Sequence, residues 1–171
     1  NWEEKIEKMA ISTTTENVSN ISGVPSWTLV LLKRILEINK TENILDIWPN
    51  LELFMHGGVN FSPYKEQFKK IAPGNQLNYY ENYNATEGFF GLQDQSKVEE
   101  MLLMLDYGIF YEFIEKAEID SESPKTVTLE DVELNKNYAV IITTNAGLWR
   151  YIIGDTVEFT SINPFRIKVT G

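Results

Sequence analysis

The sequence contains no cysteine and no long hydrophobic run. The lack of cysteine excludes a disulfide scaffold and thiolate metal sites, and it fits a reducing cytoplasm. The longest apolar stretch, residues 27–32, is far shorter than the roughly 20 residues that a membrane span requires. The amino-terminal residues also lack the basic and then apolar order of a signal peptide. We therefore expect a cytoplasmic protein that does not enter a membrane.

Basic side chains are scarce as well. The chain has 15 Lys and Arg against 25 Asp and Glu, a formal net charge of -10, and no basic cluster along which a phosphate backbone could lie. Nucleic-acid binding is therefore disfavoured. What is present is 43% hydrophobic residues in 171, enough for one domain with a real core or for two small subdomains.

The first half of the chain alternates strand-like and helix-like segments. Residues 51–55 and 76–83 indicate strands, and residues 63–71 indicate a helix. A further helix is expected from about Ser26 to Ile38, and one face of it is expected to pack inward. The apolar positions of that face are Trp27, Val30, Leu31, Ile35 and Ile38. This alternation predicts an α/β fold with a mainly parallel sheet and crossover helices over residues 1–88.

The second half is expected to form a β-rich subdomain over residues 89–171, with antiparallel strands in a distorted barrel. The alternation with helices stops after Gly88, and turn residues separate short β-like runs. These runs are residues 89–93, 101–105, 109–113, 138–143, 149–153, 157–161 and 166–169.

The run Tyr-Asn-Ala-Thr-Glu-Gly at residues 83–88 follows a predicted strand and combines an aromatic ring, a hydroxyl and a carboxylate. Tyr83 could stack on a purine, Thr86 could donate to a phosphate oxygen, and Glu87 could supply a hard oxygen to Mg²⁺. The structural alternative places Thr86 as a helix cap, Glu87 in the first helical turn and Tyr83 in the core.

Asp155 is expected in a turn between two strands, where it either serves its own backbone or accepts both hydroxyls of a ribose. Arg150 is expected to be a solvated or salt-bridged strand residue. His56, with no nucleophile pattern around it, is expected to be structural. Gly57 and Gly58 indicate either a turn or a gap for a flat base at the end of a strand.

Five motifs in this order resemble the auxin-responsive Gretchen Hagen family of acyl-acid amido synthetases, in its bacterial branch. The motifs are Ile21-Ser22-Gly23-Val24-Pro25-Ser26-Trp27, Trp48-Pro49-Asn50-Leu51-Glu52, His56-Gly57-Gly58-Val59, Tyr83-Asn84-Ala85-Thr86-Glu87-Gly88 and the run from Gly147 to Asp155. The resemblance covers nearly the whole chain. It implies the large amino-terminal domain of an adenylate-forming enzyme.

The resemblance implies that a carboxylate attacks the α-phosphate of MgATP to give acyl-AMP and pyrophosphate, and that an amine, such as that of an amino acid, then takes the acyl group. By the matching motifs, Tyr83 would pack on adenine, Thr86 would bind the α-phosphate and Glu87 would hold Mg²⁺. Asp155 would hold the ribose. Further nucleotide-binding residues implied are Ala85, Gly57 and Gly58.

The family's phosphate-binding loop and its mobile carboxyl-terminal domain have no counterpart in this sequence. We therefore expect a central fragment that does not catalyse by itself. Two other functions stay open: an acyl-coenzyme A ligase of the same superfamily, and a non-catalytic interaction module. The sequence does not identify the acid, the acceptor or the oligomeric state.

Overall fold

The computed structural model describes residues 1–96 and 98–171, and these form two compact units, Asn1–Glu81 and Asn82–Gly171. The sequence placed a boundary after Gly88, whereas the contacts divide the chain within strand β3 (Asn78–Ala85). Each unit has its own hydrophobic core. Within the described ranges, no helix is both long and apolar enough to cross a membrane.

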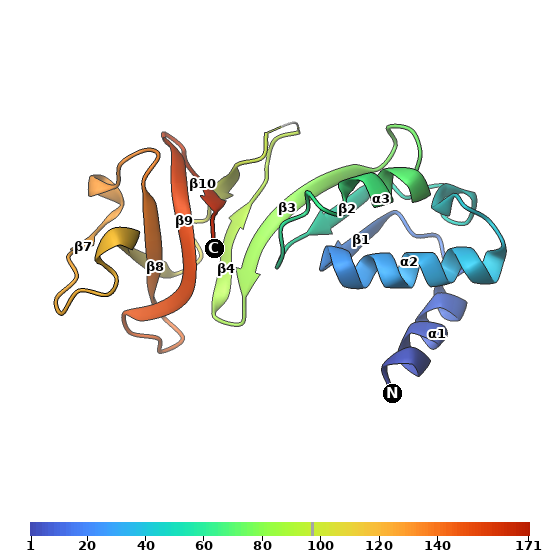
Figure 1. The fold of residues 1–171 in the computed structure, drawn as a ribbon, viewed down its shortest axis with the longest axis horizontal. Helices are drawn as coiled ribbons and strands as arrows, with labels where there is room; N and C mark the ends of the chain where they lie inside the picture. Colours follow the sequence, from blue (N-terminus) through green and yellow to red (C-terminus); the bar gives the residue numbers. More distant parts are fainter. Residues whose placement is uncertain (97) are drawn as a thin grey trace. The chain divides into compact units, whose positions relative to one another are not determined.

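Unit 1 is built around a parallel sheet, as the sequence predicts. Strands β1, β2 and the first half of β3 pair in parallel, and the helices α2 and α3 form the crossovers between them (Figure 1). The elements of unit 1 are α1 (Trp2–Thr13), β1 (Asn20–Gly23), α2 (Pro25–Asn39), the 3-10 helix η1 (Ile44–Asp46), β2 (Leu53–His56), α3 (Lys65–Ile71) and the start of β3.

Local signals explain where α2 begins and ends. Pro25 occupies its first turn, where the missing N–H costs nothing, and Lys40 closes it in the left-handed conformation with φ 53°. The sequence predicts the correct helix and part of its buried face. Ile35 is fully buried, and Leu31 and Ile38 pack partly buried against the core, whereas Trp27 is 55% exposed and Val30 46% exposed. α2 is apolar on several sides, so packing against the rest of unit 1 decides which stripe is buried. That stripe consists of Pro25, Leu29, Leu32, Ile35 and Leu36.

Unit 2 is a curled antiparallel sheet. Its strands follow the order β3, β4, β5, β10, β9, β8, β6, β7, and each neighbouring pair is antiparallel. The antiparallel part of the prediction is therefore confirmed. The elements after β3 are β4 (Gly88–Leu92), β5 (Met101–Leu103), β6 (Ile109–Glu115), η2 (Lys116–Glu118), β7 (Thr126–Val127), η3 (Leu129–Asp131), β8 (Asn137–Thr144), β9 (Tyr151–Ile162) and β10 (Phe165–Val169).

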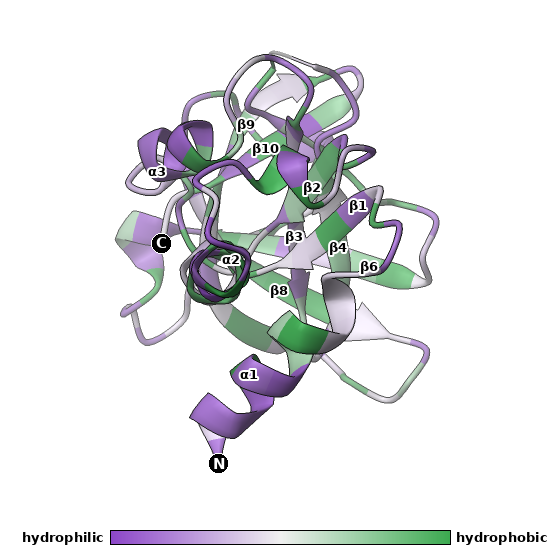
Figure 2. Ribbon diagram, turned by 90° about the vertical axis from the view of Figure 1, so that its right-hand side faces the viewer, coloured by the Kyte–Doolittle hydropathy of each residue, from purple (hydrophilic) through white to green (hydrophobic). Residues whose placement is uncertain are grey.

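β8 is buried on both faces, because Tyr138 to Ile142 are all buried, and Figure 2 shows this strand largely in the hydrophobic colour. Tyr138, Val140 and Ile142 belong to the main core of unit 2, whereas Ala139 and Ile141 form a smaller cluster with Ile114. Phe159 of β9 is fully buried and packs edge-on against Phe113 of β6, with ring centroids 5.1 Å apart. Side chains from β3, β4, β5 and β10 join the same cluster.

Candidate functional site

The turn between β3 and β4 carries the hydroxyl and the carboxylate that the sequence predicts for nucleotide binding. Ala85 pairs with Gly88, so Thr86 and Glu87 form the two-residue tip of a hairpin. The Thr86 hydroxyl donates to Oε2 of Glu87 over 2.8 Å. No helix begins here, which makes the helix-cap alternative for Thr86 and Glu87 wrong.

Tyr83 and Asp155 are brought together from strands that are not neighbours. The Tyr83 hydroxyl of β3 donates to Oδ2 of Asp155 of β9 over 2.8 Å, although β4, β5 and β10 lie between these strands in the sheet order. The Tyr83 side chain is only 7% exposed, and its ring packs 4.9 Å from that of Phe90. Tyr83 therefore belongs to the core and also anchors a carboxylate at the edge of that core.

The structure corrects the expectation that Asp155 lies in a turn. β9 is one continuous strand, and the pairing register with β8 shifts between Ala139 and Ile141. Gly154 takes up the irregularity at φ 100°, a value that favours glycine. Asp155 lies within this irregular stretch, residues 153–155, and its bond to the buried Tyr83 places its carboxylate on the core side of β9.

The β9 residues on this core side are called the inner row here: Tyr151, Ile153, Asp155, Val157 and Phe159. Tyr151 belongs to it because it pairs opposite Ile142, a fully buried core residue. Tyr151 lies within the run from Gly147 to Asp155, but no role was predicted for it, because its place on the core side follows only from the pairing of β9 with β8.

Electrostatics keep the turn carboxylate ionised. The hydrogen bond from the Thr86 hydroxyl is the main cause that lowers the pKa of Glu87. Burial is the main cause that raises the pKa of the Tyr83 phenol, and the bond to Asp155 adds to it. Tyr83 therefore stays a neutral donor at physiological pH, and Glu87 stays an anion.

The oxygen atoms that the turn offers as ligands decide whether Mg²⁺ fits there. Among residues 1–96 and 98–171, no three His, Cys, Asp or Glu side chains gather as a metal cluster. Mg²⁺, however, is commonly held by one or two carboxylates together with substrate phosphates and water. A single ionised carboxylate on an exposed hairpin tip fits that use, and it does not fit a metal site made by the protein alone.

The remaining predicted residues divide between the units. Gly57 and Gly58 follow β2 in unit 1, and Gly58 has φ 79°, so this turn requires glycine. Their nearness to a nucleotide stays a prediction. His56 is 4% exposed and stacks on Phe61, as expected of a structural residue. Arg150 pairs with Glu112 over 3.0 Å, which confirms the salt-bridged alternative.

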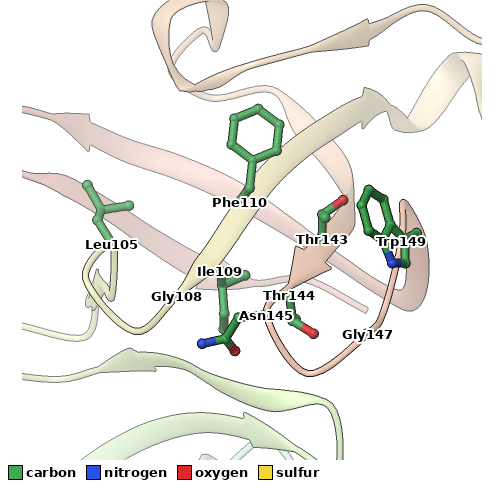
Figure 3. Close-up of a pocket in the computed structure, with 9 residues that line it drawn as sticks. All are labelled: Leu105, Gly108, Ile109, Phe110, Thr143, Thr144, Asn145, Gly147 and Trp149. Carbon is green, nitrogen blue, oxygen red and sulfur yellow. The ribbon is translucent and has the colours of Figure 1, made fainter.

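A pocket of about 540 Å³ lies in unit 2, at the start of β6 and the connection from β8 to β9 (Figure 3). Ile109 lines it, and a Cβ added to Gly88 would lie 3.0 Å from Cδ1 of Ile109, so the pocket adjoins the Thr86–Glu87 turn. Its wall is mostly apolar with uncharged polar groups. The lining residues are Leu105, Gly108, Ile109, Phe110, Thr143, Thr144, Asn145, Gly147 and Trp149.

Two family models match this chain. The GH3 family N-terminal domain matches residues 1–77, and the GH3 family central domain matches residues 102–171. An indole-3-acetic acid-amido synthetase of Arabidopsis thaliana, GH3.3, is 28% identical over 179 residues. That alignment covers 94% of this chain and 29% of the relative, so the chain spans about three tenths of the relative's length.

Solved structures show the same fold. The GH3.15 acyl acid amido synthetase matches all of this chain with a TM-score of 0.75 at 16% identity, and the match covers 40% of that protein. A long-chain-fatty-acid-CoA ligase from Archaeoglobus fulgidus matches 96% of this chain with a TM-score of 0.63 at 15% identity, over 36% of its own length. The architecture is therefore that of adenylate-forming enzymes.

Proposed function

Because this chain belongs to the GH3 family, we propose that it is part of an ATP-dependent acyl-acid amido synthetase. The acid's carboxylate would attack the α-phosphate of ATP, giving acyl-AMP and pyrophosphate. The amine of an amino acid would then attack the acyl carbon, forming the amide and releasing AMP. The observation that carries the proposal is the Tyr83–Asp155 bond, which closes the sheet beside the turn that presents Thr86 and Glu87.

The proposed roles follow from the chemistry of each group. Thr86 would donate to an α-phosphate oxygen, and Asp155 would accept from the ribose hydroxyls. Glu87 would hold Mg²⁺, which supplies charge neutralisation when bound. Tyr83 would border the adenine with the small exposed part of its ring, and Ala85 would keep the hairpin backbone beside the nucleotide. Such a reaction depends on alignment more than on a protein nucleophile.

The pocket beside the turn suits the apolar part of an acyl acid. Phe110 and Trp149 offer aromatic surface, and both are more than half exposed in this structure. Ile109 of the pocket wall lies next to Gly88 of the Thr86–Glu87 turn, so an acid placed there would lie near that turn. This pocket is therefore the proposed acyl-binding surface.

The amide product is favoured over the thioester. The family models and the curated relative belong to amido synthetases, whereas the coenzyme A ligase shares only the fold at 15% identity. Comparing an amino acid with coenzyme A as acceptor in the full-length protein separates the two reactions. A thioester as the main product would favour the acyl-coenzyme A ligase.

The test of the proposed function uses the full-length protein with Glu87→Gln and Asp155→Asn. We expect each change to lower acid-dependent pyrophosphate release by about 100-fold, the order found when one group that stabilises a transition state is removed. Glu112→Gln is the matched control, because this carboxylate pairs with Arg150 rather than facing the turn. Unchanged pyrophosphate release in both variants would show that the two carboxylates are structural. No acid-dependent release by the unmodified full-length protein would favour the non-catalytic module instead.

A further inference from the structure

The side chain of Asn145 is an uncharged polar group that faces the pocket of unit 2. Asn145 follows the last residue of β8, is exposed, and lines the pocket together with Thr143 and Thr144. In the part of the chain that the structure describes, its side-chain amide makes no hydrogen bond. A primary amide offers two donor hydrogens and an acceptor oxygen, so this group is available to a ligand.

The turn after β8 does not need this amide. An asparagine in a turn usually bonds to its own backbone, but here backbone groups close the turn. The N–H of Gly147 donates to the Thr144 carbonyl over 3.2 Å, and the N–H of Thr144 donates to the Leu148 carbonyl over 2.9 Å. The Thr143 hydroxyl is also engaged, because it accepts from the Arg150 N–H over 3.0 Å.

Gly108 gives the amide its place at the pocket. A Cβ added to Gly108 would lie 3.1 Å from Nδ2 of Asn145 and 3.4 Å from its Cγ. Gly108 also has φ 72°, a value that favours glycine. The amide therefore packs on the backbone of Gly108, in space that a side chain at this position would take.

The amide lies on the side of the pocket that adjoins the Thr86–Glu87 turn. Ile109 follows Gly108, pairs with Thr144 of β8, and would lie 3.0 Å through its Cδ1 from a Cβ added to Gly88. Figure 3 shows Asn145 on the side of β6 to which Ile109 points. An acid that packs on Ile109 therefore lies near both the turn and the amide.

Hydrogen bonding is the polar interaction by which this pocket can select an acid. None of the described residues that line it carries a charge. A small number of polar groups in an apolar pocket commonly fixes the orientation of a ligand and gives specificity. The Asn145 amide can donate to a carbonyl oxygen, and it can both donate to and accept from a hydroxyl.

We propose that Asn145 is a specificity-determining residue, which makes the site prefer acids with an uncharged hydroxyl or carbonyl substituent over the corresponding apolar acids. The proposal rests on the proposed function, which places the acid in this pocket. It goes beyond that function because it names a chemical class of acid and the side chain that selects it.

The test measures acid-dependent pyrophosphate release by the full-length protein with acids that differ by one hydroxyl. Phenylacetate is compared with its three ring-hydroxylated isomers, and hexanoate with its terminally hydroxylated derivative. The unmodified protein should prefer at least one hydroxylated acid by about threefold to tenfold in kcat/KM, the factor expected for one hydrogen bond. Asn145→Leu nearly keeps the size of the side chain and removes its donors and acceptor, so it should abolish the preference.

Two further variants and one control sharpen the test. Ala146→Leu places the same side chain at the next position, which is not part of the pocket wall, and should keep the preference. Gly108→Ala should displace the amide through its added Cβ and reduce the preference. Gly74→Ala controls for the left-handed backbone, because Gly74 has φ 93° and an added Cβ there would meet no atom within 4 Å.

The outcomes separate this inference from the proposed function. If the unmodified protein releases pyrophosphate with these acids but prefers no hydroxylated one, or if Asn145→Leu keeps the preference, the inference is overturned and the function stands. Equal losses of kcat/KM for both acids of a pair in Asn145→Leu indicate a structural role and also overturn it. If the unmodified protein shows no acid-dependent release, the proposed function fails and the inference fails with it. Loss of the preference in Asn145→Leu and Gly108→Ala, but in neither control, supports the inference.

Discussion

The two units differ in whether the polar groups on their core faces are hydrogen-bonded. In unit 1, His56 lies on the buried face of β2 beside Phe54, and its Nδ1 atom is buried without a hydrogen-bond partner. In unit 2, the Tyr83 hydroxyl and the Asp155 carboxylate meet at the core edge over 2.8 Å. Unit 1 therefore tolerates a buried polar group in its neutral form, whereas unit 2 holds a carboxylate through a donor.

This difference indicates which unit can hold a charged side chain. Burial disfavours the imidazolium form and lowers the pKa of His56 to about 4, so the ring is neutral at physiological pH and serves as an aromatic packing group. Glu87, in contrast, has a lowered pKa chiefly because the Thr86 hydroxyl donates to it. The two carboxylates with proposed ligand-binding roles, Glu87 and Asp155, therefore both belong to unit 2.

The largest loss of stability is expected when a buried aromatic ring is removed from the core of one unit at a time. Phe54 and Phe159 are both fully buried, and each packs against further aromatic rings of its own unit. Phe54→Ala and Phe159→Ala should each lower the free energy of unfolding by about 3–5 kcal/mol, from lost burial and the cavity left behind.

Urea unfolding gives the size of each loss, and hydrogen exchange resolved along the chain gives its place. We expect Phe54→Ala to lower protection chiefly within residues 1–81 and Phe159→Ala within residues 82–171, as the division of contacts implies. Equal loss of protection in both units from either variant would contradict the description of two cores.

The sequence predicted this division of architecture because each half has a clear pattern. Segments 51–55, 63–71 and 76–83 alternate strand and helix, and the pattern after Gly88 is strand-like throughout. The buried face of α2 was predicted only in part: Ile35 is buried as expected, but Trp27 and Leu29 are both apolar and only packing selects Leu29 for the core. Local propensity identifies an element more reliably than it identifies the element's neighbours.

The site was predicted in part for a similar reason. Thr86 and Glu87 stand next to each other in the sequence, so their shared turn follows from local pattern alone. Tyr83 and Asp155 are 72 residues apart, and only the curling of the sheet brings them together. The continuous strand β9 was missed because Gly154 resembles a turn signal, although here it marks a bulge.

An effect of intermediate size is expected from the pH dependence of stability, which tests the buried imidazole of His56 in unit 1. His56 has a pKa of about 4 when folded and 6.5 as its ordinary value, so the unfolded chain binds more protons between these values. Stability from this group is therefore complete above about pH 6.5 and is lost as the pH falls toward 4. Each pKa unit corresponds to about 1.4 kcal/mol, which sets an upper bound of about 3 kcal/mol.

The measurement is the free energy of unfolding at pH 7 and at pH 4.5, in the original chain and in His56→Phe. Both proteins should lose stability on acidification through their carboxylates, but His56→Phe should lose less. His56 is the only histidine, so the difference between the two proteins reports on unit 1 alone. Equal losses would show that the buried imidazole does not resist protonation.

The smallest expected effect on stability separates backbone strain from site geometry. Gly74 in unit 1 has φ 93° and Gly154 in unit 2 has φ 100°, and a Cβ added at either position would meet no atom within 4 Å. Gly74→Ala and Gly154→Ala should therefore cost the same, about 1–2 kcal/mol each, through the left-handed backbone alone. Only Gly154→Ala should also weaken nucleotide binding by the full-length protein, because Gly154 sets the bulge before Asp155.

Equal stability loss with unchanged nucleotide binding in both variants would show that the bulge does not orient Asp155. A larger stability loss in one variant would show that the backbone of its unit adjusts less easily to the added Cβ.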